Sequence, residues 1–264
     1  MEQIVALLFG LGAITTHELG HYLAMRECGV RIKEVALLGI PVRYLPSFRW
    51  THGDTLWGVH LFVIGAYVEP ASEKEVPSKG LWDQIYIYCN GITANIVYAL
   101  LMGSLAFLVS DDWFKTEMQK AVFVASFAGS AWLIWMGRRF VALALPILAL
   151  PVLGLIVYSI FSVTPNEAVE QGSGGPVAVI SLLTKANSYA GAFWLAGIIS
   201  LSLALVNLAP IIPLDGGKIF LALIERVAGS KVAKTFEWIT VPAFLLLIVY
   251  MLGLDVLRIF KSIF

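Results

Sequence analysis

Apolar residues gather along this chain in long runs that are separated by short polar links. Runs of roughly 17–25 apolar residues are long enough to cross a membrane as helices. The pattern predicts six such spans, with approximate bounds 3–25, 82–109, 121–136, 140–163, 190–212 and 241–260. The first run lacks a basic leader and a clear cleavage site, so we interpret it as a retained span and not as a signal peptide.

Residues 29–70 follow a different pattern. The runs "VRIKEVALLGIPVRYL" and "DTLWGVHLFVIGAYVEP" are rich in β-branched and aromatic residues, and "THGD" between them is a turn signal. These runs are too apolar for a solvated loop and too interrupted for a helix. We therefore expect an α-helical polytopic membrane protein of about six transmembrane helices, with a membrane-associated β-hairpin or small sheet after the first.

Composition supports a membrane protein and excludes an ordinary soluble domain. The chain is 59% hydrophobic and 14% charged, with a mean hydropathy of +0.83. Soluble domains are about 45–50% apolar and about 25% charged. The formal net charge of zero gives no indication of a nucleic-acid partner. We expect a multi-pass protein of the cell membrane, whose first partner is the lipid bilayer.

The distribution of Lys and Arg predicts the orientation of the spans. If the six spans alternate in direction, thirteen of the 18 Lys and Arg residues fall on one side, in the links 26–81, 137–139 and 213–240. Links with excess positive charge face the cytoplasm. The sequence thus predicts that both termini face outside, across a prokaryotic plasma or inner membrane, and that the β-region lies at the cytoplasmic face.

The first span carries polar side chains where a membrane helix normally has leucine. In "HELGH", a helix places His17 and His21 on one face, about 6 Å apart, and turns Glu18 about 100° away. In this H-E-x-x-H arrangement the imidazoles bind zinc and the carboxylate is free to accept a proton from water. The alternative is a chance match, but ionisable groups cost roughly 2–3 kcal/mol each within a span.

A third ligand is expected, because catalytic zinc usually has three protein ligands and one open position. The stretch "NLAPIIPLDGGK" offers Asp215. Pro210 and Pro213 break the fifth span, so its end should be unwound, and Gly216 and Gly217 allow close backbone approach. An ordinary helix end with a turn is the alternative for this stretch. His52 and His60 are weaker candidates, since they lack helical spacing.

The depth of these residues gives an independent argument. His17 and His21 lie near the cytoplasmic end of an outside-to-inside span. Asp215 follows the fifth span, which runs in the same direction only if the number of crossings between them is odd. Spans two, three and four supply three crossings, so the topology predicts that Asp215 meets the two histidines.

The chain resembles the site-2 protease family of intramembrane zinc metalloproteases. The motifs "HELGH", "GAYVEP", "GITAN", "GGPVAV" and "NLAPIIPLDGG" occur in the family's order and cover residues 1–110 and 172–260. The resemblance implies that one zinc ion per chain is bound by His17, His21 and Asp215, with Glu18 as general base and acid. It also implies that the substrate backbone and scissile carbonyl are held by Gly91, Asn95 and Asn207.

The resemblance also suggests how the chain is organised. We expect one metalloprotease domain over residues 1–264, in which a first catalytic half (1–110, with β-region 29–70) and a second (172–264) flank an extra transmembrane hairpin at 111–171. Relatives with a "GGPVAV"-like stretch often carry a PDZ domain in this position, whereas this chain has two extra spans. Regulation by a membrane partner in place of a PDZ domain is compatible with the sequence. Ile92 follows Gly91 where many members have proline.

The sequence predicts an intramembrane zinc endopeptidase that cleaves a membrane-protein substrate near its cytoplasmic end. A zinc transporter or sensor is one alternative, but it would need ligands along several spans and would not use Glu18. A catalytically inactive relative that binds transmembrane clients is the other alternative.

The predicted topology can be tested at the Arg138–Arg139 link. In a background without Cys28 and Cys89, a single cysteine introduced by Gly137→Cys should react with impermeant thiol reagents only from the cytoplasmic side, because positive links stay in the cytoplasm. Labelling of intact cells compared with inverted vesicles measures this. Labelling from outside would contradict the crossing argument.

Overall fold

The computed structural model describes residues 1–39, 47–60, 65–109 and 186–263 of the chain. Within these ranges it is mostly helical, with one small sheet. Four helices are long and apolar enough to cross a membrane, namely Glu2–Glu27, Leu81–Val109, Tyr189–Asn207 and Ser230–Lys261. They correspond to four of the six predicted spans. The other two, at 121–136 and 140–163, lie outside the described residues.

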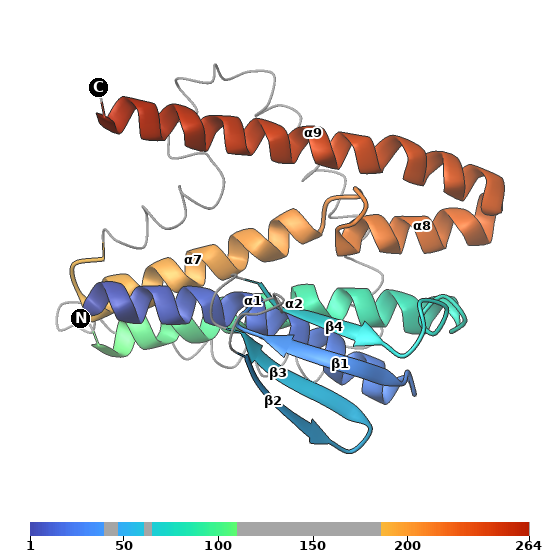
Figure 1. Ribbon diagram of the computed structural model, residues 1–264, viewed down its shortest axis with the longest axis horizontal. Coiled ribbons are helices and arrows are strands. Elements are labelled where there is room, and N and C mark those ends of the chain that lie inside the picture. The colour runs from blue at the N-terminus through green and yellow to red at the C-terminus, as the bar shows by residue number, and fades with distance from the viewer. Residues whose placement is uncertain (40–46, 61–64, 110–185, 264) are drawn as a thin grey trace, which may run out of the picture.

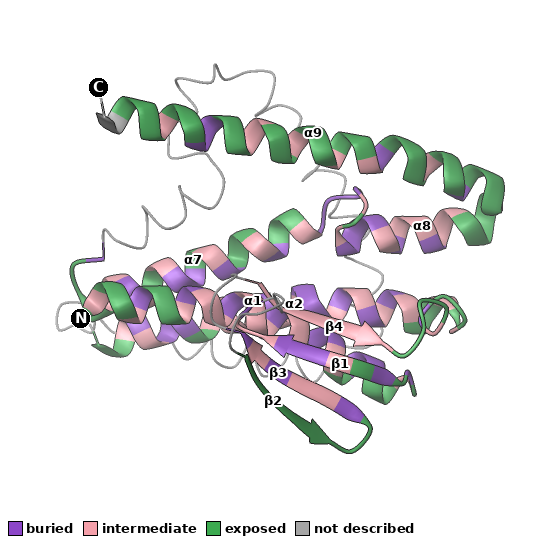
Figure 2. Cartoon of the chain, in the orientation of Figure 1, coloured by how far each residue is buried: buried purple, intermediate pink, exposed green. Residues whose placement is uncertain are grey.

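Three of these helices pack against one another: α1 (Glu2–Glu27), α2 (Leu81–Val109) and α7 (Tyr189–Asn207). In Figure 1, α1 and α7 run in the same direction and α2 runs in the opposite direction. The shared direction of α1 and α7 is what the crossing argument requires. Figure 2 shows the buried residues of these helices on the sides that face one another, whereas α9 (Ser230–Ile263) is largely exposed.

Small residues allow α1 to lie close to its neighbours. Its buried residues recur at helical spacing and, besides the two histidines and Met25, they are all alanine or glycine: Ala6, Gly10, Ala13, Gly20 and Ala24. Small residues let helix backbones approach closely in an apolar medium, where van der Waals packing and hydrogen bonds hold helices together. Between α1 and α2, the Asn90 amide donates a hydrogen bond of 2.8 Å to the carbonyl of Gly20.

The sheet has four strands in the order β2–β3–β1–β4. Their bounds are Ile32–Leu37 for β1, Ser47–His52 for β2, Thr55–His60 for β3 and Tyr67–Pro70 for β4. The predicted turn at "THGD" is present, with Gly53 at φ +61° between β2 and β3. Apolar residues of the sheet pack on the ends of α1 and α2, around Met25, Val35 and Ile87.

The two predicted runs lie in one small sheet, as expected, but they do not form a simple hairpin. The first run supplies β1, and the second supplies both β3, which is parallel to β1, and β4, which is antiparallel to it. The hairpin partner of β3 is instead β2, which begins in the short segment "SFRW" between the runs. Every residue of β2 is exposed, so this strand lacks the alternation of apolar and polar residues that marks a half-buried strand.

The end of the fifth span is unwound, as its prolines predict. Helix α7 ends at Asn207 instead of near residue 212, and a non-helical link leads to α8 (Asp215–Ala228). Asp215 therefore begins a helix and does not lie within an irregular turn, and α8 is an element that the hydrophobic pattern did not predict. Its charged residues and 14-residue length hide it from a search for membrane spans. Helix α9 also begins earlier than predicted, at Ser230.

The close approach of α1 and α2 predicts an unusual response to a methyl group. Glycine to alanine normally stabilises a helix by about 1 kcal/mol. At Gly20, however, the new Cβ would lie 2.8 Å from Cβ of Ala94 and against the carbonyl of Asn90. Gly20→Ala should therefore destabilise the protein by about 1–3 kcal/mol, the cost of overpacking. Thermal unfolding in detergent measures this effect.

Gly253→Ala is the matched control, because nothing lies within 4 Å of a Cβ at that position in α9. It should leave the unfolding temperature unchanged or raise it. Equal effects of the two substitutions would show that the α1–α2 contact is looser than described.

Candidate metal centre

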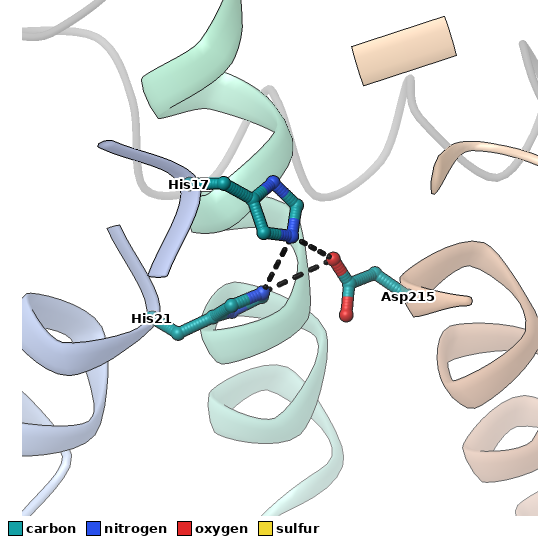
Figure 3. A group of neighbouring side chains, drawn as sticks. All are labelled: His17, His21 and Asp215. Carbon is teal, nitrogen blue, oxygen red and sulfur yellow. Dashed lines mark hydrogen bonds and ion pairs between the residues drawn. The ribbon is translucent and has the colours of Figure 1, made fainter. Parts of the chain in front are cut away.

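Two imidazoles and one carboxylate meet at a single buried point. His17 and His21 lie one turn apart on α1, and both are buried. Their Nε2 atoms are 3.1 Å apart, and Oδ2 of Asp215 lies 3.0 Å from the first and 3.1 Å from the second. Figure 3 shows the three side chains pointing toward one another from α1 and α8. The structure thus brings together the three residues that the sequence predicted as ligands.

The position of Asp215 follows from the break after α7. The link packs so tightly on the start of α8 that a side chain at Gly216 or Gly217 would overlap backbone atoms of residues 208–212. Asp215 is the first residue of α8, where the helix dipole favours a negative charge. Burial by itself would raise the pKa of Asp215, but attraction to His21 and hydrogen bonds with both imidazoles hold this pKa well below its usual value. The carboxylate is therefore ionised, as a metal ligand must be.

The atoms of the ligand side chains that face away from this point also have partners. Nδ1 of His21 donates to the backbone carbonyl of Ile87, at 2.8 Å. Oδ1 of Asp215 accepts a hydrogen bond from Nζ of Lys218, at 3.3 Å. Nδ1 of His17 lies 3.2 Å from Nδ2 of Asn95. Such outer contacts fix the orientation of metal ligands. Lys218 is a site residue that the sequence reasoning missed, although its i,i+3 spacing from Asp215 could have indicated it.

Gly91 provides the space that the two imidazoles occupy. A Cβ at this position of α2 would overlap the ring of His21 and lie 2.9 Å from Cε1 of His17. Gly91 and Asn95 both lie on the α2 side of the histidines, and Asn95 is completely buried. Gly91 and the side chain of Asn95 thus lie against the two histidines, and the role of both residues toward a substrate stays a prediction.

A cavity of about 210 Å³ opens on the other side of the ligands. It is lined by all three ligands together with Glu18, Asn207, Tyr88, Lys218 and Val68 of β4. Glu18 is not part of the group of converging ligand atoms, which agrees with a carboxylate that lies beside a metal. Asn207 ends α7, and its amide donates to the carbonyl of Leu203. Glu18 and Asn207 can therefore meet a molecule that enters the cavity.

The arrangement suits a divalent metal ion such as zinc. Two imidazole nitrogens and a carboxylate oxygen are ligands that zinc accepts, and tetrahedral zinc holds its ligand atoms about 3.3 Å apart. The ligand atoms observed here are 3.0–3.1 Å apart. Among the described residues, this is the one group of three or more His, Cys, Asp or Glu side chains with such spacing. His52 and His60 lie on the sheet and are not part of it.

Comparison with known proteins gives a consistent result. The family model described as peptidase family M50 matches residues 4–251. A protein of Clostridium perfringens, provisionally named a zinc metalloprotease, is 36% identical over 105 residues, which are 38% of this chain and 30% of that protein. A similar protein of Campylobacter jejuni, with the same provisional name, is 32% identical over 101 residues, 37% of this chain and 27% of its own length.

The metalloprotease MmpA of Caulobacter vibrioides is 30% identical over 160 residues. These residues make up 49% of this chain and 39% of the relative. Each match thus spans less than half the length of the relative.

The space at Gly91 predicts a loss of metal binding when it is filled. Gly91→Ala should push the imidazoles away from their meeting point and weaken Zn²⁺ binding at least about tenfold, as disturbed outer contacts do. Titration of the purified protein with Zn²⁺ against a competing chelator measures the affinity.

Gly103→Ala, on the same helix, is the control, because the nearest atom to its Cβ is a ring carbon of Trp194 at 4.0 Å. It should leave metal affinity unchanged. If Gly91→Ala also left the Zn²⁺ affinity unchanged, the positions of the two imidazoles would not depend on the space at Gly91.

Proposed function

The chain belongs to peptidase family M50, and on this basis we propose that it is a zinc-dependent endopeptidase that cleaves membrane proteins within the bilayer. The observation that carries the proposal is the convergence of His17, His21 and Asp215 beside a cavity that Glu18 also lines. The names of its relatives as zinc metalloproteases and its multi-pass membrane character support the same function.

In this proposal His17, His21 and Asp215 hold the zinc ion. When bound, zinc polarises the scissile carbonyl and lowers the pKa of water in the site toward about 7. Glu18 acts as general base, taking a proton from the attacking water, and then as general acid, giving it to the leaving amine. Its position on the cavity wall, outside the ligand group, suits this role. Asn207 lines the same cavity and orients the substrate backbone.

The substrate must present an extended segment to these residues. A transmembrane helix uses its backbone groups in its own hydrogen bonds, so it has to unwind before cleavage. We propose that the unwound segment pairs with β4, which lies at one edge of the sheet and brings Val68 to the cavity. Addition of a strand to a sheet edge satisfies the freed backbone groups.

The orientation of the protein follows from the charge distribution. His17 and His21 lie in the second half of α1, toward the links that are rich in Lys and Arg. We therefore propose that the termini face outside and that cleavage occurs near the cytoplasmic face.

A zinc transporter or sensor fits the site less well. It would need further ligands along a path through the bilayer, and the described residues contain one metal-suited group only. An inactive relative that binds transmembrane clients shares all of these features except the use of Glu18. The proton transfer by Glu18 is therefore the step that an experiment has to test.

Glu18→Gln should separate catalysis from metal binding. Glutamine keeps the size of the side chain but cannot accept a proton, so cleavage of a model transmembrane substrate should fall by about 10²–10⁴-fold. Zinc content should stay near one ion per chain. His17→Ala should remove both zinc and cleavage. Zinc analysis and a gel-based cleavage assay on the same samples measure this.

The controls for this experiment are His52→Ala and His60→Ala, which should leave zinc content unchanged. A Glu18→Gln variant that cleaves as fast as the parent would contradict the hydrolytic mechanism. Loss of zinc from that variant would make Glu18 a ligand instead of a base. The same variant should retain uncut clients, so crosslinking in cells can identify the substrate.

A further inference from the structure

The two zinc-ligating histidines differ in what fixes their tautomers. The carbonyl of Ile87 can only accept a hydrogen bond, so Nδ1 of His21 carries a proton and Nε2 is the nitrogen left to bind a metal. This contact belongs to the backbone of α2. The Nδ1 of His17 instead faces a side chain, the amide of Asn95, at 3.2 Å. An amide presents either a donor or an acceptor, depending on its rotation.

In the described orientation the amide nitrogen of Asn95, and not its oxygen, faces His17. With Nδ2 of Asn95 donating to Nδ1, His17 must carry its proton on Nε2, where it faces Asp215 and His21 at 3.0 and 3.1 Å. A protonated Nε2 cannot bind a metal. In the same orientation Oδ1 of Asn95 is buried and has no hydrogen-bond partner in the described part of the chain. Buried polar atoms without partners are rare and costly.

Rotation of the amide by half a turn would give Oδ1 a hydrogen-bond partner and leave Nε2 of His17 free to bind a metal. Oδ1 then faces His17 and accepts a hydrogen bond from a proton on Nδ1. The charge of the ring does not change, because one proton leaves Nε2 and one is taken up at Nδ1. Nε2 is left with a lone pair that points at the place where Nε2 of His21 and Oδ2 of Asp215 also converge.

We propose that Asn95 is a positioning residue whose amide oxygen holds His17 in the tautomer that binds the metal. Asn95 is well placed for this role. It is completely buried, and the hydroxyl of Ser200 on α7 donates a 2.9 Å hydrogen bond to its backbone carbonyl. Asn95 is thus held between α1, α2 and α7, and it is not among the residues that line the cavity. This inference rests on the metal site of the proposed function and assigns Asn95 a contact with one of its ligands.

The test compares Zn²⁺ affinities of the full chain in detergent, with Glu18→Gln present throughout so that self-cleavage plays no part. Asn95→Leu has a similar size but no acceptor, and it should bind Zn²⁺ about 10–100-fold more weakly. Asn95→Ala removes the amide without adding bulk, and it should show the same loss. Asn95→Asp keeps an acceptor for Nδ1–H and should bind within about threefold of the parent, as carboxylate–histidine–zinc arrangements do.

Asn90→Leu is the matched control. Asn90 lies on the same helix and also contacts α1, but its amide donates to the carbonyl of Gly20 and not to a ligand. Asn90→Leu should lower the unfolding temperature of the metal-free protein and leave zinc affinity unchanged. If the role of Asn95 were merely structural, Asn95→Leu and Asn95→Ala would behave like Asn90→Leu. They would lower the unfolding temperature and leave zinc affinity unchanged.

Parent-like affinity in Asn95→Leu and Asn95→Ala would therefore overturn the proposal. Equal weakening by Asn95→Asp and Asn95→Leu would also overturn it, because the acceptor would then be irrelevant. Failure of the parent sequence, without Glu18→Gln, to cleave any substrate would count against the protease function alone, provided that the order of affinities is as expected.

Discussion

The structure depends on the meeting of three ligand atoms that come from opposite parts of the chain. His21 and Asp215 are 194 positions apart, yet their side chains are 3.1 Å apart in a buried setting. Groups of this kind are expensive to place among apolar helices unless they satisfy one another or a metal. The packing of α1 against α2, the break after α7 and the glycines at the start of α8 all serve this one contact.

The site has a closed side and an open side. On the closed side, α2 supplies the space at Gly91, the carbonyl of Ile87 and the amide of Asn95. On the open side, the cavity is bordered by Glu18, Asn207 and β4. The closed side holds groups that orient the ligands, and the open side holds groups that can meet water and peptide. This division lets the ligands stay fixed while a substrate enters.

The sequence was sufficient for the parts of the fold that depend on local pattern. Apolar length predicted the four described helices that are long enough to cross a membrane, and histidine spacing with helix direction predicted the three side chains that converge. The pairing of strands was not predictable in this way. Strand β2 is exposed throughout, and β1 pairs in parallel with β3, which follows β2 in the sequence. Helix α8 was missed because it is short and carries charge. The roles of Gly91 and Asn95 depend on which helix faces α1, which no local pattern contains.

The small residues of α1 connect stability to chemistry. Only a close approach of α1 and α2 brings a backbone carbonyl of α2 within 2.8 Å of an imidazole on α1. Bulkier residues at this interface would move α2 away from α1 and leave Nδ1 of His21 without its hydrogen-bond partner. The tautomer of the His21 ring would then no longer be fixed. The alanines and glycines on the buried face of α1 therefore matter for more than helix packing. They set the distance at which the backbone of one helix can orient a metal ligand on the next.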